Sequence, residues 1–183
     1  MYKLLIADDE PRIRKGLRNA LNWNEFNIEV VGEAEDGEIA LIQTEKLKPD
    51  IIFLDICMPF LNGLELIRKL NEKDQNCIII IITGYDEFEY MHEALKLKTF
   101  DYLLKPVPKE VLIDTVNKAI QEIRKNEEKK VYLDWADRRL DENFDMLKQA
   151  FLNNWLNGSY EYVEILNELK FFKYNFDIKD RKS

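Results

Sequence analysis

Five short apolar segments recur along the chain, and segments with helical spacing separate them. The apolar segments lie at residues 3–7, 28–34, 51–55, 77–83 and 101–105. The third and fourth consist almost entirely of Ile, Leu, Phe and Cys, which is typical of strands that are covered on both faces. Each segment has the length of a strand, so the pattern predicts five strands in one buried sheet.

Between these segments, apolar side chains recur every third or fourth residue, as on one face of a helix. This spacing predicts helices at residues 11–21, 37–47, 63–70 and 87–97, and a further helix that starts near Lys109. Strands that alternate with helices are joined by right-handed crossovers, which make neighbouring strands parallel. The fold class is therefore α/β, with a doubly wound parallel sheet and a C-terminal helical extension.

The extension has no Gly or Pro between Lys109 and Asn157, so it can form one helix of 49 residues, about 70 Å long. Its middle, residues 121–130, is dominated by charge, which fits a solvated helix or a hinge. Beyond it, a seven-residue repeat has leucine at one position and alanine or asparagine at the second: Leu133, Leu140, Leu147, Ala136, Asn143 and Ala150. The repeat fits a short coiled coil, and it fits equally a helix packed on a neighbouring domain. Asn157-Gly158 then predicts a helix stop.

The composition narrows the class of protein. Apolar residues make up 46 % of the chain, enough for a substantial core, and the formal charge of −8 disfavours a nucleic-acid surface, which is basic. Cys57 and Cys77 lie in or beside apolar segments, so we expect buried, reduced thiols. The N-terminus turns acidic too early for a signal peptide. No apolar run approaches the roughly 20 residues of a spanning helix, and we expect a cytoplasmic protein.

Three carboxylates stand where predicted strands end. Asp8 and Asp9 follow the first strand, and Asp55 ends the third. Parallel strands present their carboxyl ends at one edge of the sheet, where ligands of open α/β sheets bind. Three like charges at one place repel strongly in a partly dry site. Such a cluster persists when a cation neutralises it or when one member is used chemically, so we expect a functional site at this edge.

Short motifs at the strand ends carry a resemblance to a known family. They are Ile6-Ala7-Asp8-Asp9-Glu10, Asp55-Ile56-Cys57-Met58-Pro59 with Asn62-Gly63, Thr83-Gly84, and Tyr102-Leu103-Leu104-Lys105-Pro106. In this order they resemble the receiver domain of two-component response regulators, over residues 1–125. The resemblance implies a flavodoxin-like receiver fold with five parallel strands in the order 2-1-3-4-5. Residues 126–183 are then a helical linker or the start of a following domain, with the coiled coil as one possible form.

The resemblance also implies the chemistry of the site. Asp55 accepts a phosphoryl group from a sensor histidine kinase, and Lys105 and Thr83 contact the phosphoryl oxygens. The cofactor implied is Mg²⁺, which prefers oxygen ligands. Its ligands are the carboxylates of Asp9 and Asp55, the carboxylate of Asp8 through water, and the backbone carbonyl of Cys57. The family further implies a cis peptide bond between Lys105 and Pro106.

In this family the signal leaves the site through a switch. A phosphoryl group on Asp55 draws Thr83 inward, and the aromatic ring of Tyr102 rotates into the space that this movement opens. The predicted fourth helix has one apolar face with Phe88, Met91 and Leu95. These side chains belong to the core or contact the partner in a homodimer that forms on phosphorylation.

Two features depart from the family pattern. Lys98 stands where a glycine commonly ends the preceding helix, so we expect a different turn there. Cys57 and Tyr85 stand at two positions that commonly orient the water for dephosphorylation, and neither is an acid or an amide. We therefore expect slow self-dephosphorylation. The single histidine, His92, lies in a helical segment, where a surface or packing role is expected.

Longer segments narrow the resemblance. Residues 23–26, 30–34, 83–90 and 100–107 are similar to regulators of the YesN type. In these proteins a receiver precedes a helical linker region and an AraC-type DNA-binding domain, which we expect outside the present 183 residues. We therefore expect the input module of a transcription regulator, which catalyses only its own phosphorylation and dephosphorylation.

Two alternatives stay open at this point. One is a stand-alone receiver that acts as a phosphorelay or adaptor protein. The other is a Mg-dependent aspartyl-phosphate phosphatase of haloacid-dehalogenase type, which also uses Asp, Thr and Lys. Such enzymes carry Asp-x-Asp after the first strand, and Asp8-Asp9 does not have that spacing.

Overall fold

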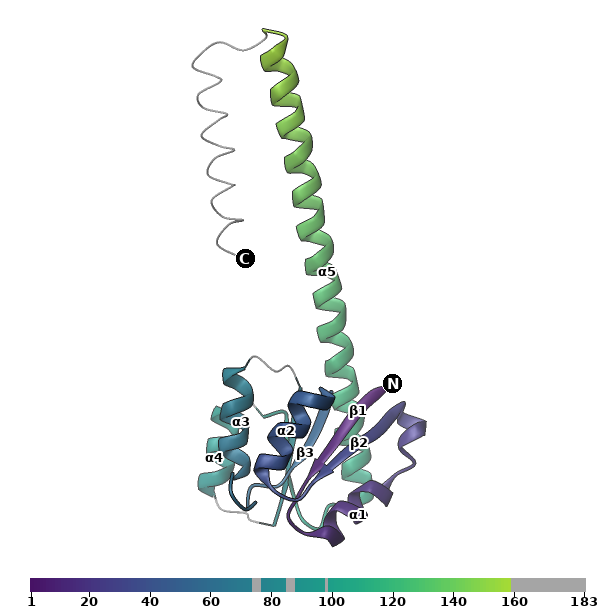
Figure 1. Ribbon diagram of the computed structural model, residues 1–183. Helices are drawn as coiled ribbons and strands as arrows, with labels where there is room; N and C mark the ends of the chain where they lie inside the picture. The colour runs from purple at the N-terminus through teal and green to yellow at the C-terminus, as the bar shows by residue number, and fades with distance from the viewer. Residues whose placement is uncertain (74–76, 85–87, 98, 159–183) are drawn as a thin grey trace. The chain divides into compact units, whose positions relative to one another are not determined.

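The computed structural model (Figure 1) describes residues 1–73, 77–84, 88–97 and 99–158. The chain divides into two compact units, Met1–Asn126 and Glu127–Ser183. The expectations for Tyr85 and Lys98 lie outside the described residues. The expectation for the apolar face of the fourth helix also lies outside them, because it rests on the side chains of Phe88, Met91 and Leu95.

Five parallel strands form one sheet in the order β2-β1-β3-β4-β5, which confirms the predicted fold class. The strands are β1 (Tyr2–Ala7), β2 (Ile28–Ala34), β3 (Ile51–Leu54), β4 (Ile78–Thr83) and β5 (Asp101–Leu104). The register pairs Ala7 with Leu54 and Thr83 with Leu104. The carboxyl ends of β1 and β3 therefore lie side by side, and so do those of β4 and β5.

The helices lie close to the predicted positions. They are α1 (Pro11–Ala20), α2 (Gly37–Leu47), α3 (Gly63–Glu72), α4 (Phe88–Lys96) and α5 (Lys109–Leu156), and a short 3-10 helix (Trp23–Phe26) follows α1. The differences are small. Helix α3 continues past the predicted end to Glu72, and α4 begins at Phe88, just after the predicted start.

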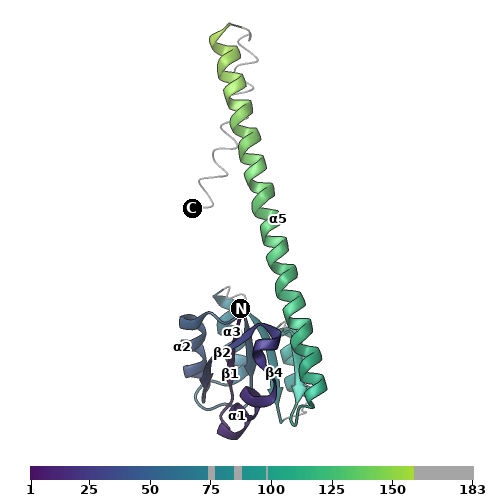
Figure 2. The same cartoon turned by 90° about the vertical axis from the view of Figure 1, so that its right-hand side faces the viewer.

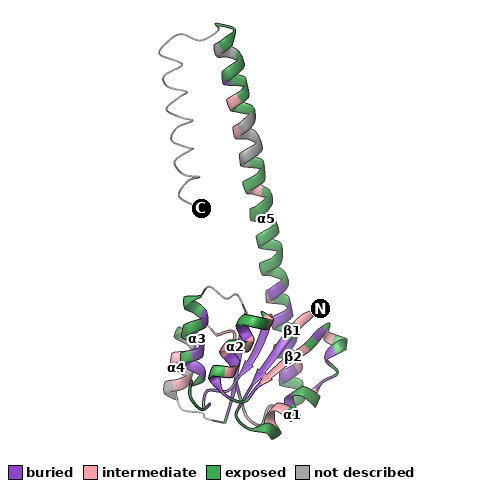
Figure 3. Ribbon diagram, viewed as in Figure 1, coloured by how far each residue is buried: buried purple, intermediate pink, exposed green. Residues whose placement is uncertain are grey.

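Helices cover both faces of the sheet, with α1 and the first part of α5 on one face and α2, α3 and α4 on the other (Figures 1 and 2). Alternate residues of β1 enter different cores. Leu4 and Ile6 pack beneath α1 and α5, and Leu5 and Ala7 pack beneath α2, α3 and α4. All four residues of β3 are buried, as Figure 3 also shows for the central strands. This double cover explains why β3 is apolar throughout and β4 is apolar up to its last residue, Thr83.

The loop between β3 and α3 is held against the start of α2. Asn62 caps α3, because its Oδ1 accepts a hydrogen bond from the Glu65 N–H at 2.8 Å. Gly37, the first residue of α2, approaches this loop so closely that a Cβ atom there would lie 1.8 Å from the carbonyl oxygen of Leu61. Only glycine fits at that place, so the contact fixes the loop that leaves the carboxyl end of β3.

Helix α5 is continuous over 48 residues, as its lack of Gly and Pro predicts. The part within the first unit packs on the sheet through Leu112, Val116, Ala119, Ile120 and Ile123, which are all buried. Gly158 follows the helix with φ of +71°, which agrees with the predicted helix stop.

The second unit is described over residues 127–158. Leu133 and Leu147 of the seven-residue repeat are exposed there. The side chains of Leu140 and Asn143 lie outside the description, so the coiled coil stays a prediction. In the part of the chain that the structure describes, no helix combines the length and apolar character needed to span a bilayer.

The expectation of buried thiols is wrong in degree. Cys57 and Cys77 are half-buried, and among the described residues they form no disulfide. Each lies just outside a strand: Cys57 is in the loop after β3, and Cys77 directly precedes β4. Burial, with a smaller contribution from the charge of Asp50, raises the pKa of Cys77 to about 11, so this thiol is protonated at neutral pH.

Candidate functional site

Three carboxylates meet at the carboxyl edge of the sheet. Asp8 and Asp9 follow β1, and Asp55 follows β3, the neighbouring strand. The Asp55 N–H donates to the carbonyl oxygen of Ala7 at 2.9 Å, which continues the β1–β3 pairing to the site. One carboxylate oxygen from each of the three residues lies within 4.8 Å of the others. The structure thus brings together the carboxylates that the strand pattern places at this edge.

Lys105 reaches into this cluster from the loop after β5. Its Nζ lies 2.7 Å from Oδ2 of Asp55 and 2.6 Å from Oδ2 of Asp8. The first contact is a hydrogen bond, whereas the second has the length of an ion pair without the angles of a hydrogen bond. The Lys105 N–H donates to the carbonyl oxygen of Thr83 at 2.8 Å, and the Lys105–Pro106 peptide bond is cis, as expected. Lys105 is therefore a fixed cation between two carboxylates.

The members of the cluster differ in burial, and burial acts in opposite directions on the pKa values of Asp8 and Lys105. Asp8 is almost fully buried and Asp9 is exposed. Burial raises the pKa of Asp8, and its contact with Lys105 and the hydrogen bond from the Glu10 N–H offset only part of that effect. Burial also opposes the charge of Lys105, but the contacts with Asp55 and Asp8 outweigh it, so the pKa of Lys105 is raised. Lys105 therefore stays cationic at neutral pH.

Thr83 and Tyr102 lie on adjacent strands, β4 and β5, and the Thr83 carbonyl accepts the Lys105 N–H. Thr83 ends β4 and is fully buried. Tyr102, on β5, is half-buried and packs against the core beneath α2, α3 and α4. Its N–H donates to Oδ1 of Asp101, whose Oδ2 accepts a hydrogen bond from Thr115 on α5 at 3.2 Å. The two predicted switch residues thus lie on neighbouring strands, with Thr83 at the carboxyl end of β4 and Tyr102 paired with Ile81, two residues before it.

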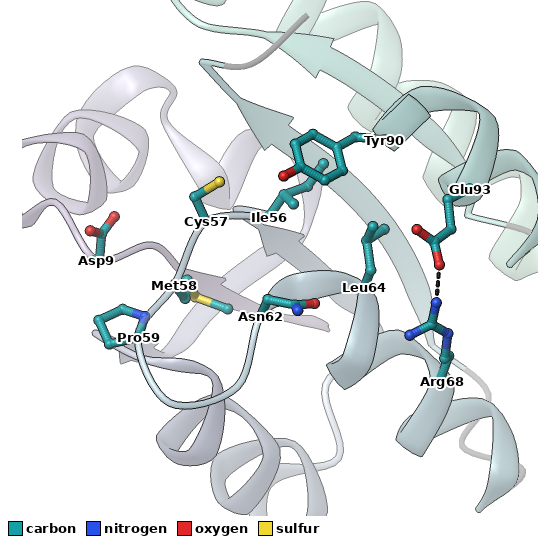
Figure 4. Close-up of a pocket in the computed structure, with 10 residues that line it drawn as sticks. All are labelled: Asp9, Ile56, Cys57, Met58, Pro59, Asn62, Leu64, Arg68, Tyr90 and Glu93. Carbon is teal, nitrogen blue, oxygen red and sulfur yellow. Dashed lines mark hydrogen bonds and ion pairs between the residues drawn. The ribbon is translucent and has the colours of Figure 1, made fainter. Parts of the chain in front are cut away.

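A pocket of about 440 Å³ opens beside the carboxylates (Figure 4). Asp9 and the β3–α3 loop line one side, and α3 and α4 line the other. The lining residues are Asp9, Ile56, Cys57, Met58, Pro59, Asn62, Leu64, Arg68, Tyr90 and Glu93. Arg68 and Glu93 form an ion pair across the α3–α4 side. Asp9 therefore borders open space, whereas Asp8 does not.

Arg14 also contacts the site, and the sequence motifs did not indicate it. Its Nη1 donates to the backbone carbonyl oxygens of Asp8, at 2.7 Å, and Asp9, at 3.2 Å. The only signal in the sequence is its position one helical turn after the start of α1. His92, in contrast, is exposed on α4, as its helical segment led us to expect.

The fold and the carboxylate edge define an α/β protein with an acidic site at the carboxyl ends of its parallel strands, and comparison with known proteins gives the family. Residues 4–117 match the profile of the response regulator receiver domain. The chain belongs to this family.

Individual relatives agree with the family. The chain is 34 % identical to the transcriptional regulatory protein YesN of Bacillus subtilis over 127 aligned residues. This alignment covers 69 % of this chain and 34 % of YesN. It is 38 % identical to the transcriptional regulatory protein HptR of Staphylococcus aureus over 107 aligned residues. That alignment covers 58 % of this chain and 42 % of HptR. The chain thus spans well under half the length of these curated relatives.

Solved structures agree on the fold. The receiver domain of AraT, a response regulator from Geobacillus stearothermophilus, superposes with a TM-score of 0.65 at 48 % identity. The match covers 69 % of this chain and 98 % of the AraT domain. The receiver domain of the Francisella response regulator 1452 gives a TM-score of 0.60 at 32 % identity, over 67 % of this chain and 99 % of that domain.

Proposed function

We propose that this chain is the phosphorylatable input part of a transcriptional response regulator, with Asp55 as the phosphoacceptor. Residues 1–125 are the receiver domain, and residues 126–183 are a helical linker or the start of a following domain. The contact of Lys105 Nζ with Asp55 at 2.7 Å supports the proposal most. It supplies a fixed cation at the nucleophilic carboxylate, and phosphoryl transfer depends mainly on such positioning and charge neutralisation.

In the proposed reaction, a carboxylate oxygen of Asp55 attacks the phosphorus of a phosphohistidine on a sensor histidine kinase. The O–P bond to Asp55 forms as the P–N bond breaks. The electron pair stays on the histidine nitrogen, and solvent supplies any proton that this nitrogen takes up. Lys105 pairs with one phosphoryl oxygen, and the Thr83 hydroxyl donates to another. The product is an acyl phosphate on Asp55.

The proposed cofactor is Mg²⁺, and the carboxylates fit it. Opposite ligands of this ion lie about 4.2 Å apart at bond lengths of about 2.1 Å. The three carboxylate oxygens already lie within 4.8 Å of one another. We assign Asp9, Asp55 and the backbone carbonyl of Cys57 as direct ligands, and Asp8 as a ligand through water. When bound, Mg²⁺ neutralises charge that develops on the phosphoryl group.

The proposed output runs through Thr83 and Tyr102. Phosphorylation draws the Thr83 hydroxyl toward Asp55, and Tyr102 moves further into the core that it already borders. The active state is a homodimer. Size-exclusion chromatography with and without the phosphoryl mimic beryllofluoride tests this step. A larger species that appears only with the mimic and Mg²⁺ is expected, and an unchanged elution volume contradicts dimerisation.

The proposed partner is a sensor histidine kinase, and the proposed output is transcription through an AraC-type DNA-binding domain outside this chain. YesN and HptR carry transcriptional regulation in their names, and this chain matches only a part of each. Signalling of this kind takes place in the cytoplasm, which is the location we propose.

The decisive assay separates a receiver from a phosphatase. With acetyl phosphate and Mg²⁺, a receiver acquires one phosphoryl group per chain, whereas a phosphatase releases phosphate from p-nitrophenyl phosphate in steady turnover. We expect self-labelling without steady turnover, and sustained ester hydrolysis contradicts the proposal.

We also propose slow self-dephosphorylation, since Cys57 and Tyr85 stand at the two positions that commonly orient the attacking water and neither is an acid or an amide. The measurement is the decay of the acyl phosphate in the wild type and in Tyr85→Glu. Equal decay rates contradict this part of the proposal.

A further inference from the structure

Resting on the proposed Mg²⁺ site, we propose that Arg14 is the positioning residue that holds the metal-binding loop in shape. Its Nη1 donates to the carbonyl oxygens of Asp8 and Asp9 at 2.7 and 3.2 Å. These are the backbone carbonyls of two residues assigned to the metal. Arg14 contacts neither carboxylate in these bonds, so its action on the metal passes through the backbone.

The guanidinium is clamped from its other side as well. Nε lies 3.7 Å from Oε2 of Glu33, and Nη2 lies 3.8 Å from Oε2 of Glu35. Glu33 is on β2 and Glu35 directly follows that strand. The Arg14 side chain is only 12 % exposed. Arg14 therefore joins the end of β2 to the end of β1, and its planar fork of donors is the feature that lets one side chain serve both ends.

Asp8 and Asp9 depend on this clamp to different extents. The Asp8 carboxylate has two further supports, because Oδ1 accepts the Glu10 N–H at 2.9 Å and Oδ2 lies 2.6 Å from Lys105. The Asp9 side chain is exposed. The orientation of the Asp9 carboxylate thus depends on the Asp9 backbone, whose carbonyl oxygen accepts a hydrogen bond from Arg14. Loss of the clamp is expected to loosen Asp9 first, which is one of the proposed direct ligands.

Charge and positioning make opposite predictions for Arg14. As a positive charge near a Mg²⁺ site, Arg14 repels the ion, so removing it strengthens Mg²⁺ binding if charge alone matters. As the holder of the loop, it keeps the ligands in place, so removing it weakens binding. Groups that orient metal ligands typically contribute about tenfold or more to metal affinity.

Arg18 offers a matched control on the same helix. It is one turn further along α1 and donates to Oε1 of Glu33 at 2.7 Å, but its side chain is 58 % exposed. Arg18→Gln removes the same charge close to the same glutamate. Arg14→Lys keeps the charge and removes the fork.

The test is the Mg²⁺ dissociation constant of the full chain, measured by titration calorimetry for the wild type, Arg14→Gln, Arg14→Lys and Arg18→Gln. We expect Arg14→Gln to weaken binding about tenfold, Arg14→Lys to weaken it less, and Arg18→Gln to leave it unchanged or slightly tighter. Equal or tighter binding by Arg14→Gln overturns the inference. If Arg14→Gln does not fold, wild-type affinity in Arg14→Lys overturns it.

An Asp9→Asn variant separates this inference from the proposed function. Wild-type protein that binds no Mg²⁺, or binds it as Asp9→Asn does, overturns the proposed metal site and the inference with it. Wild-type binding that requires Asp9 but not Arg14 overturns the inference alone.

Discussion

The ammonium nitrogen of Lys105 lies 2.7 Å from Oδ2 of Asp55, although the two residues are 50 positions apart in the chain. The same nitrogen lies 2.6 Å from Oδ2 of Asp8. One side chain thus joins the ends of three strands, β1, β3 and β5. It balances charge that would otherwise disfavour the folded edge, and it stands where a phosphoryl group on Asp55 would meet it.

Replacing Lys105 by methionine is expected to destabilise the metal-free protein. The change leaves two nearby carboxylates without their shared cation, and breaking a buried ion pair costs about 3–5 kcal/mol. Because this site borders solvent, we expect about 1–3 kcal/mol. Urea unfolding with a chelator measures it, and added Mg²⁺ should restore part of the loss. Lys118→Met is the control, since Lys118 pairs with Asp114 on an exposed helix surface. Equal losses in the two variants contradict this role for Lys105.

The stability of the metal-free protein should depend on pH through Asp8. The folded-state pKa of Asp8 is raised above the ordinary value of 3.8, mainly by burial. The folded state therefore holds this proton more tightly than the unfolded state, and stability falls as pH rises from that value through the raised pKa. Asp8→Asn removes the titration. It should be more stable than the wild type at neutral pH, with a gap that closes in acid. The measurement is the free energy of unfolding in urea for both proteins across pH. A difference between Asp8→Asn and the wild type that widens in acid contradicts the raised pKa.

The strands and the carboxylate cluster could be predicted from the sequence because they depend on local pattern and topology. Five apolar runs fixed the strands, and a parallel sheet then brings Asp8, Asp9 and Asp55 to one edge. Arg14 could not be predicted in this way. Its partners are backbone carbonyls, which every residue has, so no side-chain motif marks them.

The backbone conformation of Phe60 could not be predicted from the sequence either. Its φ is +64°, and the Leu61 N–H donates to the carbonyl oxygen of Pro59 at 2.7 Å, which makes a tight γ-turn. A phenylalanine has no preference for this conformation. The next residue, Leu61, lies against Gly37 of α2, and such a contact between distant parts of the chain leaves no local pattern in the sequence.

Phe60→Gly is expected to stabilise the fold. The left-handed backbone costs a non-glycine residue about 1–2 kcal/mol, and the added freedom of glycine in the unfolded chain offsets about 0.5–1 kcal/mol of the gain. Phe60 is 83 % exposed, so loss of its side chain removes little packing. Thermal unfolding should show a net gain of about 0.5–1 kcal/mol. Phe60→Ala keeps the strain and is the control, so an equal gain in both variants argues against strain as the cause.

Gly63→Ala is expected to displace the backbone of Asp55 and so to impair the site. A Cβ atom at Gly63 would lie 2.3 Å from the backbone carbonyl oxygen of Asp55 and 3.0 Å from Cα of Ile56. The backbone must move, which costs about 1–3 kcal/mol, and labelling by acetyl phosphate should slow because Asp55 moves with it. In Gly16→Ala, the added Cβ meets nothing within 4 Å on helix α1, so stability should rise by about 0.5–1 kcal/mol. Unchanged labelling in Gly63→Ala contradicts the prediction.

The central claim is that Asp55 carries the phosphoryl group. The measurement is intact and peptide mass analysis after incubation with acetyl phosphate and Mg²⁺, for the wild type, Asp55→Asn and Asp9→Asn. We predict one added phosphoryl group on the peptide that contains Asp55 in the wild type, none in Asp55→Asn, and much less in Asp9→Asn. Undiminished labelling of Asp55→Asn, or a label on another residue of the wild type, contradicts the assignment.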